Sequence, residues 1–456
     1  MKRLAYTIAA GQLLLLCLLL ASVSVVGAQE APQPTARGAE SQYPIDLVTT
    51  LMLAGAKNLD IELARNAVDE AHAAYDSAVE RFLPSIAPTA SYLHHGGREQ
   101  MVQGPVFDVT KHSQTAGVTV AAQIPVGEAI FQTLQSRQLL NAADAAQSVQ
   151  AQWIFLIAAQ QYFDLVRARA LIEVVTQARN ISQSYEQQLN EAVRIGVAFK
   201  GDAFRVQTQT QRLQLDLSQA TQEEQLASAR LVQTLHLDPL VELIPAEREP
   251  APLALSDISA SRKFLIQAAL QNRPEVARSS SLIAAAEQAR RGALYGPLIP
   301  TLGGQAFGGK FEGGVGDSNA DSGPRRDYGV GLSWKVGPGG LFDLGRIRAS
   351  RAQLTAAQLG DEKLRDQIER EVVEGSVRVQ SLFEQLRVAH ANVTSAEETL
   401  RLTRGRKTLG VGIVLEDIQA QQELLNARRD LVVIVTELNQ QQYALLYSVG
   451  GTLRKQ

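Results

Sequence analysis

Two long stretches of the chain contain no proline and repeat their apolar residues with helical spacing. All 16 prolines lie outside 126–238 and 339–456. Since proline breaks a helix interior at a cost of about 3 kcal/mol, each stretch is expected to hold very long helices. In the second stretch the apolar and small positions alternate by four and three. They are Ile368, Val372, Gly375, Val379, Leu382, Leu386, Ala389, Val393, Ala396 and Leu400. This spacing predicts a helix that packs lengthwise against another.

Weaker forms of the same spacing occur in two other segments. One repeats every seven residues in the last part of the chain, at Ile418, Leu425, Val432, Asn439 and Leu446. The other lies in the first proline-free stretch, at Val149, Trp153, Leu156, Phe163 and Val166. The pattern predicts several long packed helices without giving their number.

A second pattern, with a period of two, precedes each long helical stretch. Apolar residues alternate with small or polar ones from Val118 to Ile124 and from Tyr328 to Val336. A weaker strand is expected before each, near Ser85–His95 and Thr301–Gly313, which gives strand pairs over about 85–125 and 301–336. Gly96–Lys111 and Gly313–Asn319 are expected to connect them. Strands of about ten residues suit an outer membrane, although a small soluble sheet accounts equally well for the alternation alone.

The two halves of the chain follow one plan. Arg194-Ile195-Gly196-Val197, with Asp202 after it, recurs as Thr408-Leu409-Gly410-Val411, with Glu416 after it. We therefore expect a tandem repeat of 45–236 and 262–449, joined by a proline-rich linker over 237–261 and followed by a tail over 450–456. A repeat of this length is too long for a solenoid unit and indicates a duplicated half-protein.

The first 28 residues have the features of a secretory signal peptide. Lys2 and Arg3 precede an apolar segment, and small residues end it before Gln29. Cys17, the only cysteine, lies inside this segment, and lipidation there at a shortened signal is an open alternative. Residues 29–44 are expected to be an N-terminal extension. For an exported chain the apolar strand face is expected to meet lipid, and four strands cannot close a barrel there. Three chains would supply twelve strands.

Charge and side-chain chemistry narrow the function. The net charge is -3 and aromatic residues make up 5%, which argues against nucleic acid as a partner. His94, His95 and His112, with Met101 nearby, suggest metal capture, but a solvated loop is the preferred interpretation. We find no catalytic triad, metal-ligand spacing or phosphate-binding loop, so neither an enzyme nor a cofactor is expected.

The chain resembles the TolC family of outer-membrane efflux and secretion channels. Helix, strand pair, long helix, glycine turn and returning helix occur twice behind a signal peptide, and Asn272-Arg273-Pro274-Glu275-Val276 is similar to the opening of that family's second half. The resemblance covers about residues 45–450. It implies a mainly α protein with a small β part, in which a long coiled-coil helical barrel continues into a trimeric twelve-stranded transmembrane β-barrel.

The same resemblance implies a function and partners. The protein would be the passive exit duct of a tripartite efflux or type I secretion system, located in the outer membrane and reaching into the periplasm. Its partners would be two further copies of the chain, a periplasmic adaptor and an inner-membrane pump of the RND or ABC type. A periplasmic coiled-coil adaptor or scaffold is the alternative, although adaptors usually have one helical hairpin and this chain has two. The exported substrate stays open between drug, metal ion and protein.

Candidate site residues follow from the family's features at the helix tips. An acidic gate is expected at Glu416 and Asp417, with Gln419 at a second position that is acidic in relatives. Asp202 is expected to form inter-helix bonds, with Arg406 or Lys407 as its basic partner because Gly412 takes the usual basic position. Adaptor docking is expected at the two tips, which comprise Ile195, Gly196, Val197, Leu409, Gly410 and Val411. Tyr92, Tyr328 and Trp334 suit an aromatic girdle at the membrane interface.

Overall fold

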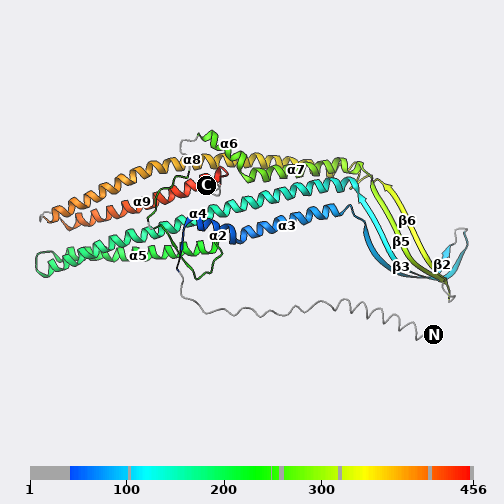
Figure 1. Cartoon of the computed structure of the whole chain (residues 1–456), viewed down its shortest axis with the longest axis horizontal. Helices are drawn as coiled ribbons and strands as arrows, with labels where there is room; N and C mark the ends of the chain where they lie inside the picture. The colour runs from blue at the N-terminus through cyan, green and yellow to red at the C-terminus, as the bar shows by residue number, and fades with distance from the viewer. Residues whose placement is uncertain are drawn as a thin grey trace, which may run out of the picture. The chain divides into compact units, whose positions relative to one another are not determined.

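The computed structural model describes residues 42–100, 104–247, 249–255, 261–316, 321–408 and 413–451. The expected signal peptide, most of the expected extension, Met101 and the Leu409–Gly412 turn lie outside these residues. The described part is mainly α with a small β part, as predicted (Figure 1).

One order of elements occurs twice along the chain. The first half contains α2 (Leu47–Lys57), α3 (Leu59–Glu80), β2 (Ser85–Gln100), β3 (Val106–Pro125), α4 (Val126–Arg194) and α5 (Lys200–Thr234). The second contains α6 (Arg262–Asn272), α7 (Pro274–Tyr295), β5 (Thr301–Val315), β6 (Asp321–Ser333), α8 (Leu344–Thr408) and α9 (Val414–Ser448). A short 3₁₀ turn, η1 (Gly296–Leu298), follows α7. Between the halves, β4 (Glu242–Pro245) pairs in parallel with β1 (Gln42–Ile45), so the end of the expected extension belongs to the fold.

The long helices pair lengthwise, α4 with α5 and α8 with α9, and run side by side in Figure 1. With 69 residues in α4 and a rise of about 1.5 Å per residue, this helix is about 100 Å long. The stripe of apolar and small residues predicted in α8 to pack against another helix is confirmed, since most of its positions are buried, including Ile368, Val372 and Val379. None of the helices in the described part of the chain is both long and apolar enough to cross a membrane.

The weaker apolar stripe predicted in α4 is only partly confirmed. Leu156, Phe163 and Val166 are buried, but Trp153 is 46% exposed. The reason is that α4 packs against α3, α5, α7 and α9, so its contacts surround the helix instead of following one stripe. The main core forms there, around the fully buried Tyr162, Leu165 and Leu231. The Trp153 ring lies beside Tyr447, with 6.4 Å between ring centroids.

The sheet has the antiparallel order β2-β3-β5-β6, and its strands are longer than predicted in places. The Gly96–Lys111 segment, expected to be a connection, is mostly strand, because β2 continues to Gln100 and β3 begins at Val106. Backbone pairing requires no apolar alternation, so polar and glycine-rich ends still join the ladder. In the other direction, Trp334 and Val336 were expected in a strand, but β6 ends at Ser333.

Candidate functional site

The turn between α4 and α5 presents apolar side chains to solvent. Gly196 has φ 81°, and the Val197 N–H donates to the Ala192 carbonyl at 2.9 Å. This is a Schellman ending, in which glycine takes the left-handed conformation without a side-chain penalty. We call residues 195–204 the first tip.

Exposed side chains of the first tip include two that the sequence interpretation missed. Ile195 and Val197, both predicted, are 60% and 73% exposed. Phe199 and Phe204, which were not singled out, are 73% and 56% exposed. Aromatic residues directly after a glycine turn were the available signal. Lys200 Nζ lies 5.7 Å from the centroid of the Phe204 ring.

The second tip is only partly described, because Leu409, Gly410 and Val411 lie outside the described residues. Its acidic side chains follow at the start of α9. Asp417 is buried, with Oδ1 3.7 Å from Arg404 Nε, and its Oδ2 accepts from Gln421 Nε2 at 2.9 Å. Glu416 Oε2 lies 3.4 Å from Arg406 Nη1. Gln419 is exposed. Basic residues at the end of α8 therefore hold both acids within one hairpin.

Asp202 lies on α5 and pairs with Arg205 of the same helix, at 3.2 Å. The expected bond from Asp202 to Arg406 is thus not formed, because Arg406 faces Glu416; the Lys407 side chain lies outside the described residues. The charges of Asp202 and Asp417 both affect the pKa of Tyr185 of α4. Burial, and then the charges of Asp417 and Asp202, raise the pKa of Tyr185 to about 12, so its phenol stays neutral.

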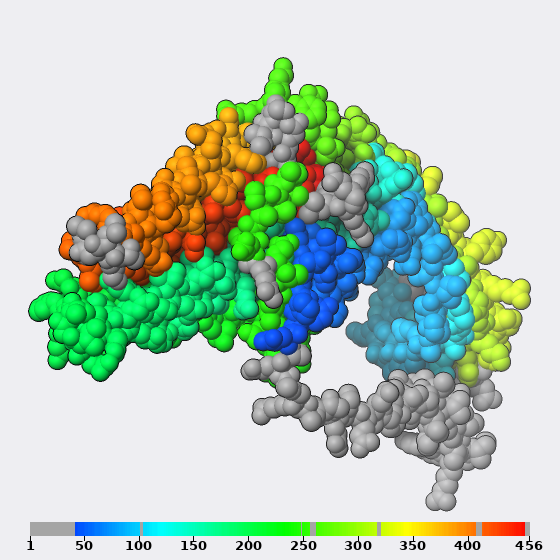
Figure 2. Space-filling model, turned by 60° about the vertical axis from the view of Figure 1, so that its left-hand side comes forward, coloured from blue at the N-terminus to red at the C-terminus, as the bar shows by residue number. Residues whose placement is uncertain are grey.

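An apolar cluster joins the two hairpins close to the tips. Tyr185, Leu189, Ala203 and Val206 of the first hairpin pack with residues of α9, among them Val414. Figure 2 shows the green end of α4 and α5 directly beside the orange and red end of α8 and α9. The sequence predicted both tips but not this contact between them.

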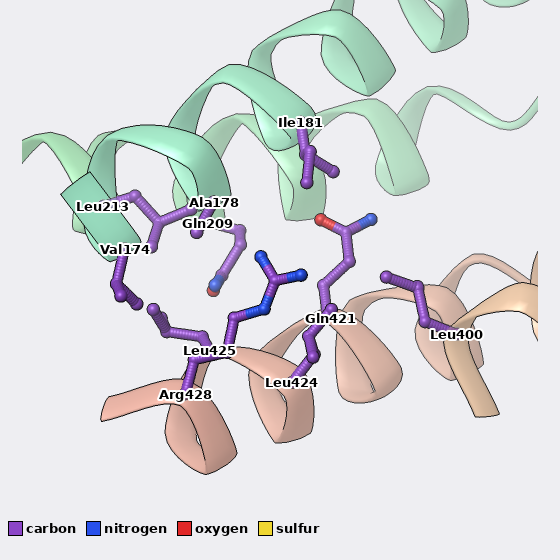
Figure 3. Close-up of a pocket in the computed structure, with 10 residues that line it drawn as sticks. All are labelled: Val174, Ala178, Ile181, Gln209, Leu213, Leu400, Gln421, Leu424, Leu425 and Arg428. Atoms are coloured by element: carbon purple, nitrogen blue, oxygen red, sulfur yellow. The ribbon is translucent and has the colours of Figure 1, made fainter. Parts of the chain in front are cut away.

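Polar contacts continue between the hairpins around a small cavity. Arg428 of α9 donates to Gln177 of α4 at 3.0 Å and to Glu397 of α8 at 2.8 Å. Arg428 and Gln421 lie at this cavity in Figure 3, opposite Ile181 and the other lining residues of α4 and α5. Further along, Arg429 pairs with Asp216 of α5 at 2.7 Å. These residues have no pattern in the sequence that distinguishes them from a solvated helix face.

One face of the sheet is apolar, and the outer strands have a free edge within the described residues. Ile86, Val120, Ala306 and Tyr328 follow one another across the four strands in register, so their side chains share a face. Tyr92 lies on this face too, and Tyr92 and Tyr328 are 63% and 92% exposed. Trp334, beyond the strand, donates from Nε1 to the Leu298 carbonyl at 3.3 Å.

The opposite face of the sheet is mostly polar. The hydroxyl oxygens of Thr89 and Thr119 lie 3.1 Å apart across β2 and β3. Arg325 Nε lies 2.7 Å from Asp327 Oδ2. Leu93, Phe311 and Phe307 are apolar exceptions on this face, and the Phe307 ring is the least exposed of the three. It lies over Gly117 and Gly309, where an added Cβ would come within 2.7 Å and 2.8 Å of its Cζ. Glycine is therefore required at both positions.

Comparison with known proteins relates this chain to a protein family. Residues 265–451 match the family model described as outer membrane efflux protein. Over 300 residues the chain is 25% identical to protein CyaE of Bordetella pertussis, a match that covers 63% of this chain. The matched part spans 60% of the length of that relative.

Solved structures share the fold over almost the whole chain. The outer membrane protein VceC of Vibrio cholerae is 18% identical with a TM-score of 0.75, covering 90% of this chain and 97% of that one. The CmeC outer membrane channel of Campylobacter jejuni is 15% identical, also with a TM-score of 0.75, covering 89% of this chain and 85% of that one. Residues 265–451 thus match the outer membrane efflux protein family, the chain shares its fold with solved outer-membrane channels, and its predicted resemblance to the TolC family is confirmed.

Proposed function

We propose that this protein is an outer-membrane channel that acts as a homotrimer, and that it is the exit duct of a tripartite efflux or type I secretion system. The observation that carries the proposal is the four-stranded sheet, which has one apolar face and, among the residues that the structure describes, two free edges. Open edges are not tolerated in lipid, because each unpaired backbone group costs several kcal/mol there. Three copies close twelve strands, with the apolar face toward lipid and the polar face toward the lumen.

The helices support the same assembly. Within the described residues α4 of the first half packs against α7 of the second half. By the internal repeat, the equivalent contact would be between α8 of the second half and α3 of the first half, but these two helices do not pack extensively within the described part of one chain. Both of these helices expose large apolar side chains. Leu63 of α3 is 65% exposed, and Leu359 of α8 is 59% exposed. Packing α8 of one copy against α3 of the next would cover these residues and repeat the internal contact around a ring.

The internal repeat also gives the register of the contact between copies. Val120 of β3 faces Ala306 of β5 within one chain. When Pro84 is aligned with Pro300 and the registers of the two hairpins are applied, the equivalent positions are Leu332 of β6 and Ala90 of β2. We therefore expect Leu332 to lie opposite Ala90 of the next copy.

Disulfide cross-linking tests this assembly, because the only native cysteine, Cys17, lies in the expected signal peptide. The Ala90→Cys, Leu332→Cys double variant is expected to give covalent trimers in outer-membrane fractions after oxidation. Pairing Leu332→Cys with Ile86→Cys is the control, since Ile86 lies about 13 Å away along the strand. A soluble periplasmic monomer, or equal cross-linking of both pairs, would exclude the proposed trimer. It would favour the adaptor alternative, which nothing in the described structure supports specifically.

Within this channel we place a gate at the acidic end of α9. Three copies of the partly exposed Glu416 at a constriction, each beside a buried Asp417, would repel one another and attract cations. Glu416→Gln and Asp417→Asn keep the side-chain size and remove the charge. Together they are expected to lower cation over anion permeability in planar bilayers. Glu398→Gln, which removes an exposed acid of α8 paired with Arg401, is the control and should leave selectivity unchanged. Wild-type selectivity in the double variant would refute the gate.

We also place adaptor docking at the tips, where the exposed apolar residues of 195–204 offer an anchor. Phe199→Ser with Phe204→Ser is expected to weaken capture of the periplasmic adaptor by the immobilised trimer about tenfold or more, because aromatic anchors dominate interface energies. Leu215→Ser is the matched control, since Leu215 is an apolar residue of the same helix and is 66% exposed away from the tip. Equal capture by both variants would show that the first tip is not the docking surface.

A further inference from the structure

Two histidines face one another across a strand pair of the sheet. His94 of β2 and His112 of β3 are direct register partners. Opposed residues of antiparallel strands carry their side chains on one face, with Cβ atoms about 4.5–5.5 Å apart. Both imidazoles can therefore reach a single metal ion, for which the metal–nitrogen bond is about 2.0–2.1 Å long. Their interpretation as scattered residues of a solvated loop is corrected, because both lie in paired strands.

The surroundings of the pair leave space for an ion. Gly96 is the next residue on the same face of β2, and a Cβ added there would lie 3.7 Å from His94 Nε2. On the other side, Gly314 of β5 faces His112. Neither neighbour has a side chain that fills the space beside the imidazoles. His94 is exposed and His112 is half-buried. Both lie on the face of the sheet that carries Tyr92, beyond this proposed interface residue toward the Gln100 end of β2, so an ion reaches them from the aqueous side of the interface.

The adjacent His95 has a different environment. It points to the opposite face and lies opposite Lys111, whose Nζ is 2.5 Å from Glu99 Oε1. A neighbouring ammonium group disfavours a bound cation. His95 is therefore a control from the same hairpin, because it is not expected to bind the ion.

We propose that His94 and His112 form a binding site for a divalent transition-metal ion of the zinc or copper type. Imidazole is a preferred ligand for these ions. Within the described ranges no group of three His, Cys, Asp or Glu side chains is placed to hold a metal, so the pair supplies two ligands and water completes the coordination. The bound ion joins β2 to β3 in the interior of both strands, six residues before β2 ends at Gln100 and six residues after β3 begins at Val106. The site does not depend on the channel function.

The test uses the full-length protein in detergent, purified without a polyhistidine tag and stripped with chelator. Titration with zinc chloride, and separately with copper chloride, is expected to show one bound ion per chain. Each of His94→Gln and His112→Gln should weaken binding about a hundredfold, because chelation by a second tethered ligand is lost. His95→Gln should bind like the wild type. Size-exclusion chromatography confirms that each variant keeps the assembly of the wild type.

A second measurement reports the position of the ion. Amide hydrogen exchange in the paired segments of β2 and β3 around His94 and His112 should slow on metal addition in the wild type and in His95→Gln only. Absence of stoichiometric binding to the wild type overturns the proposal. Equal affinity of the wild type and His94→Gln, or equal loss in His95→Gln, overturns it as well.

Discussion

Replacing Arg273 by Ala is expected to destabilise the protein by about 3–5 kcal/mol, because it leaves a buried carboxylate without its partner. The Arg273 side chain is 5% exposed. Its guanidinium lies 2.7 Å from Glu275 Oε1 and 2.6 Å from Glu371 Oε2. It also lies 5.4 Å from the Tyr447 ring centroid, so one side chain joins α7, α8 and α9.

The control for this variant is a surface pair close by in the sequence. Arg291 and Glu287 form an ion pair along α7 with side chains 46% and 38% exposed. Arg291→Ala is expected to cost about 0–1 kcal/mol, as exposed pairs do. The measurement is the midpoint of guanidinium unfolding, followed by helical circular dichroism. Similar midpoints for the two variants would contradict a stabilising role for the Arg273 cluster.

The same cluster predicts a direction for pH dependence. Burial raises the pKa of Glu275, but the hydrogen bonds and charge of Arg273 outweigh it, and the net pKa is lowered. A lowered folded-state pKa stabilises the fold fully above the ordinary glutamate value, and this contribution is lost as the pH falls through the lowered value. Acid should therefore destabilise the wild type more steeply than Arg273→Ala. Parallel pH profiles would contradict this expectation.

The second large effect is expected for Gln442→Leu, which should cost about 2–4 kcal/mol because it leaves buried backbone groups without hydrogen bonds. Gln442 of α9 is fully buried. Its amide accepts from the Leu255 N–H at 2.9 Å and donates to the Leu253 carbonyl at 2.7 Å. Asn439, one turn earlier, binds Leu253 N–H and the Ala251 carbonyl in the same manner, both at 2.8 Å. The two amides hold the linker as a neighbouring strand would.

Two measurements test this linker clamp. Gln442→Leu should lower the unfolding midpoint and make the segment 250–255 sensitive to limited proteolysis. Gln385→Leu is the control, because Gln385 is an exposed amide on α8 and its replacement should change stability by less than about 0.5 kcal/mol. Unchanged proteolysis in Gln442→Leu would show that the linker is held by other contacts.

Asn439 illustrates the limit of sequence interpretation at these sites. Its seven-residue spacing predicted a position that packs against another helix, and the residue is 3% exposed. The pattern could not show that the buried amide binds the linker, because its partners lie about 190 residues away in the chain. Arg273 is a similar case, since the motif was visible but its second partner, Glu371, comes from another helix. Hydrogen-bond partners at such separation are set by packing, which local spacing does not encode.

The sequence by itself determined the repeated helix and strand order, because proline positions, heptad spacing and two-residue alternation act on neighbouring residues along the chain. Only the tertiary structure decided which groups meet. It paired Arg406 with Glu416 instead of Asp202, exposed Trp153 on a helix that is packed on many sides, and set His94 opposite His112. The physical reason is that backbone conformation follows local residue preferences, whereas contacts between distant residues depend on how whole helices and strands pack and register.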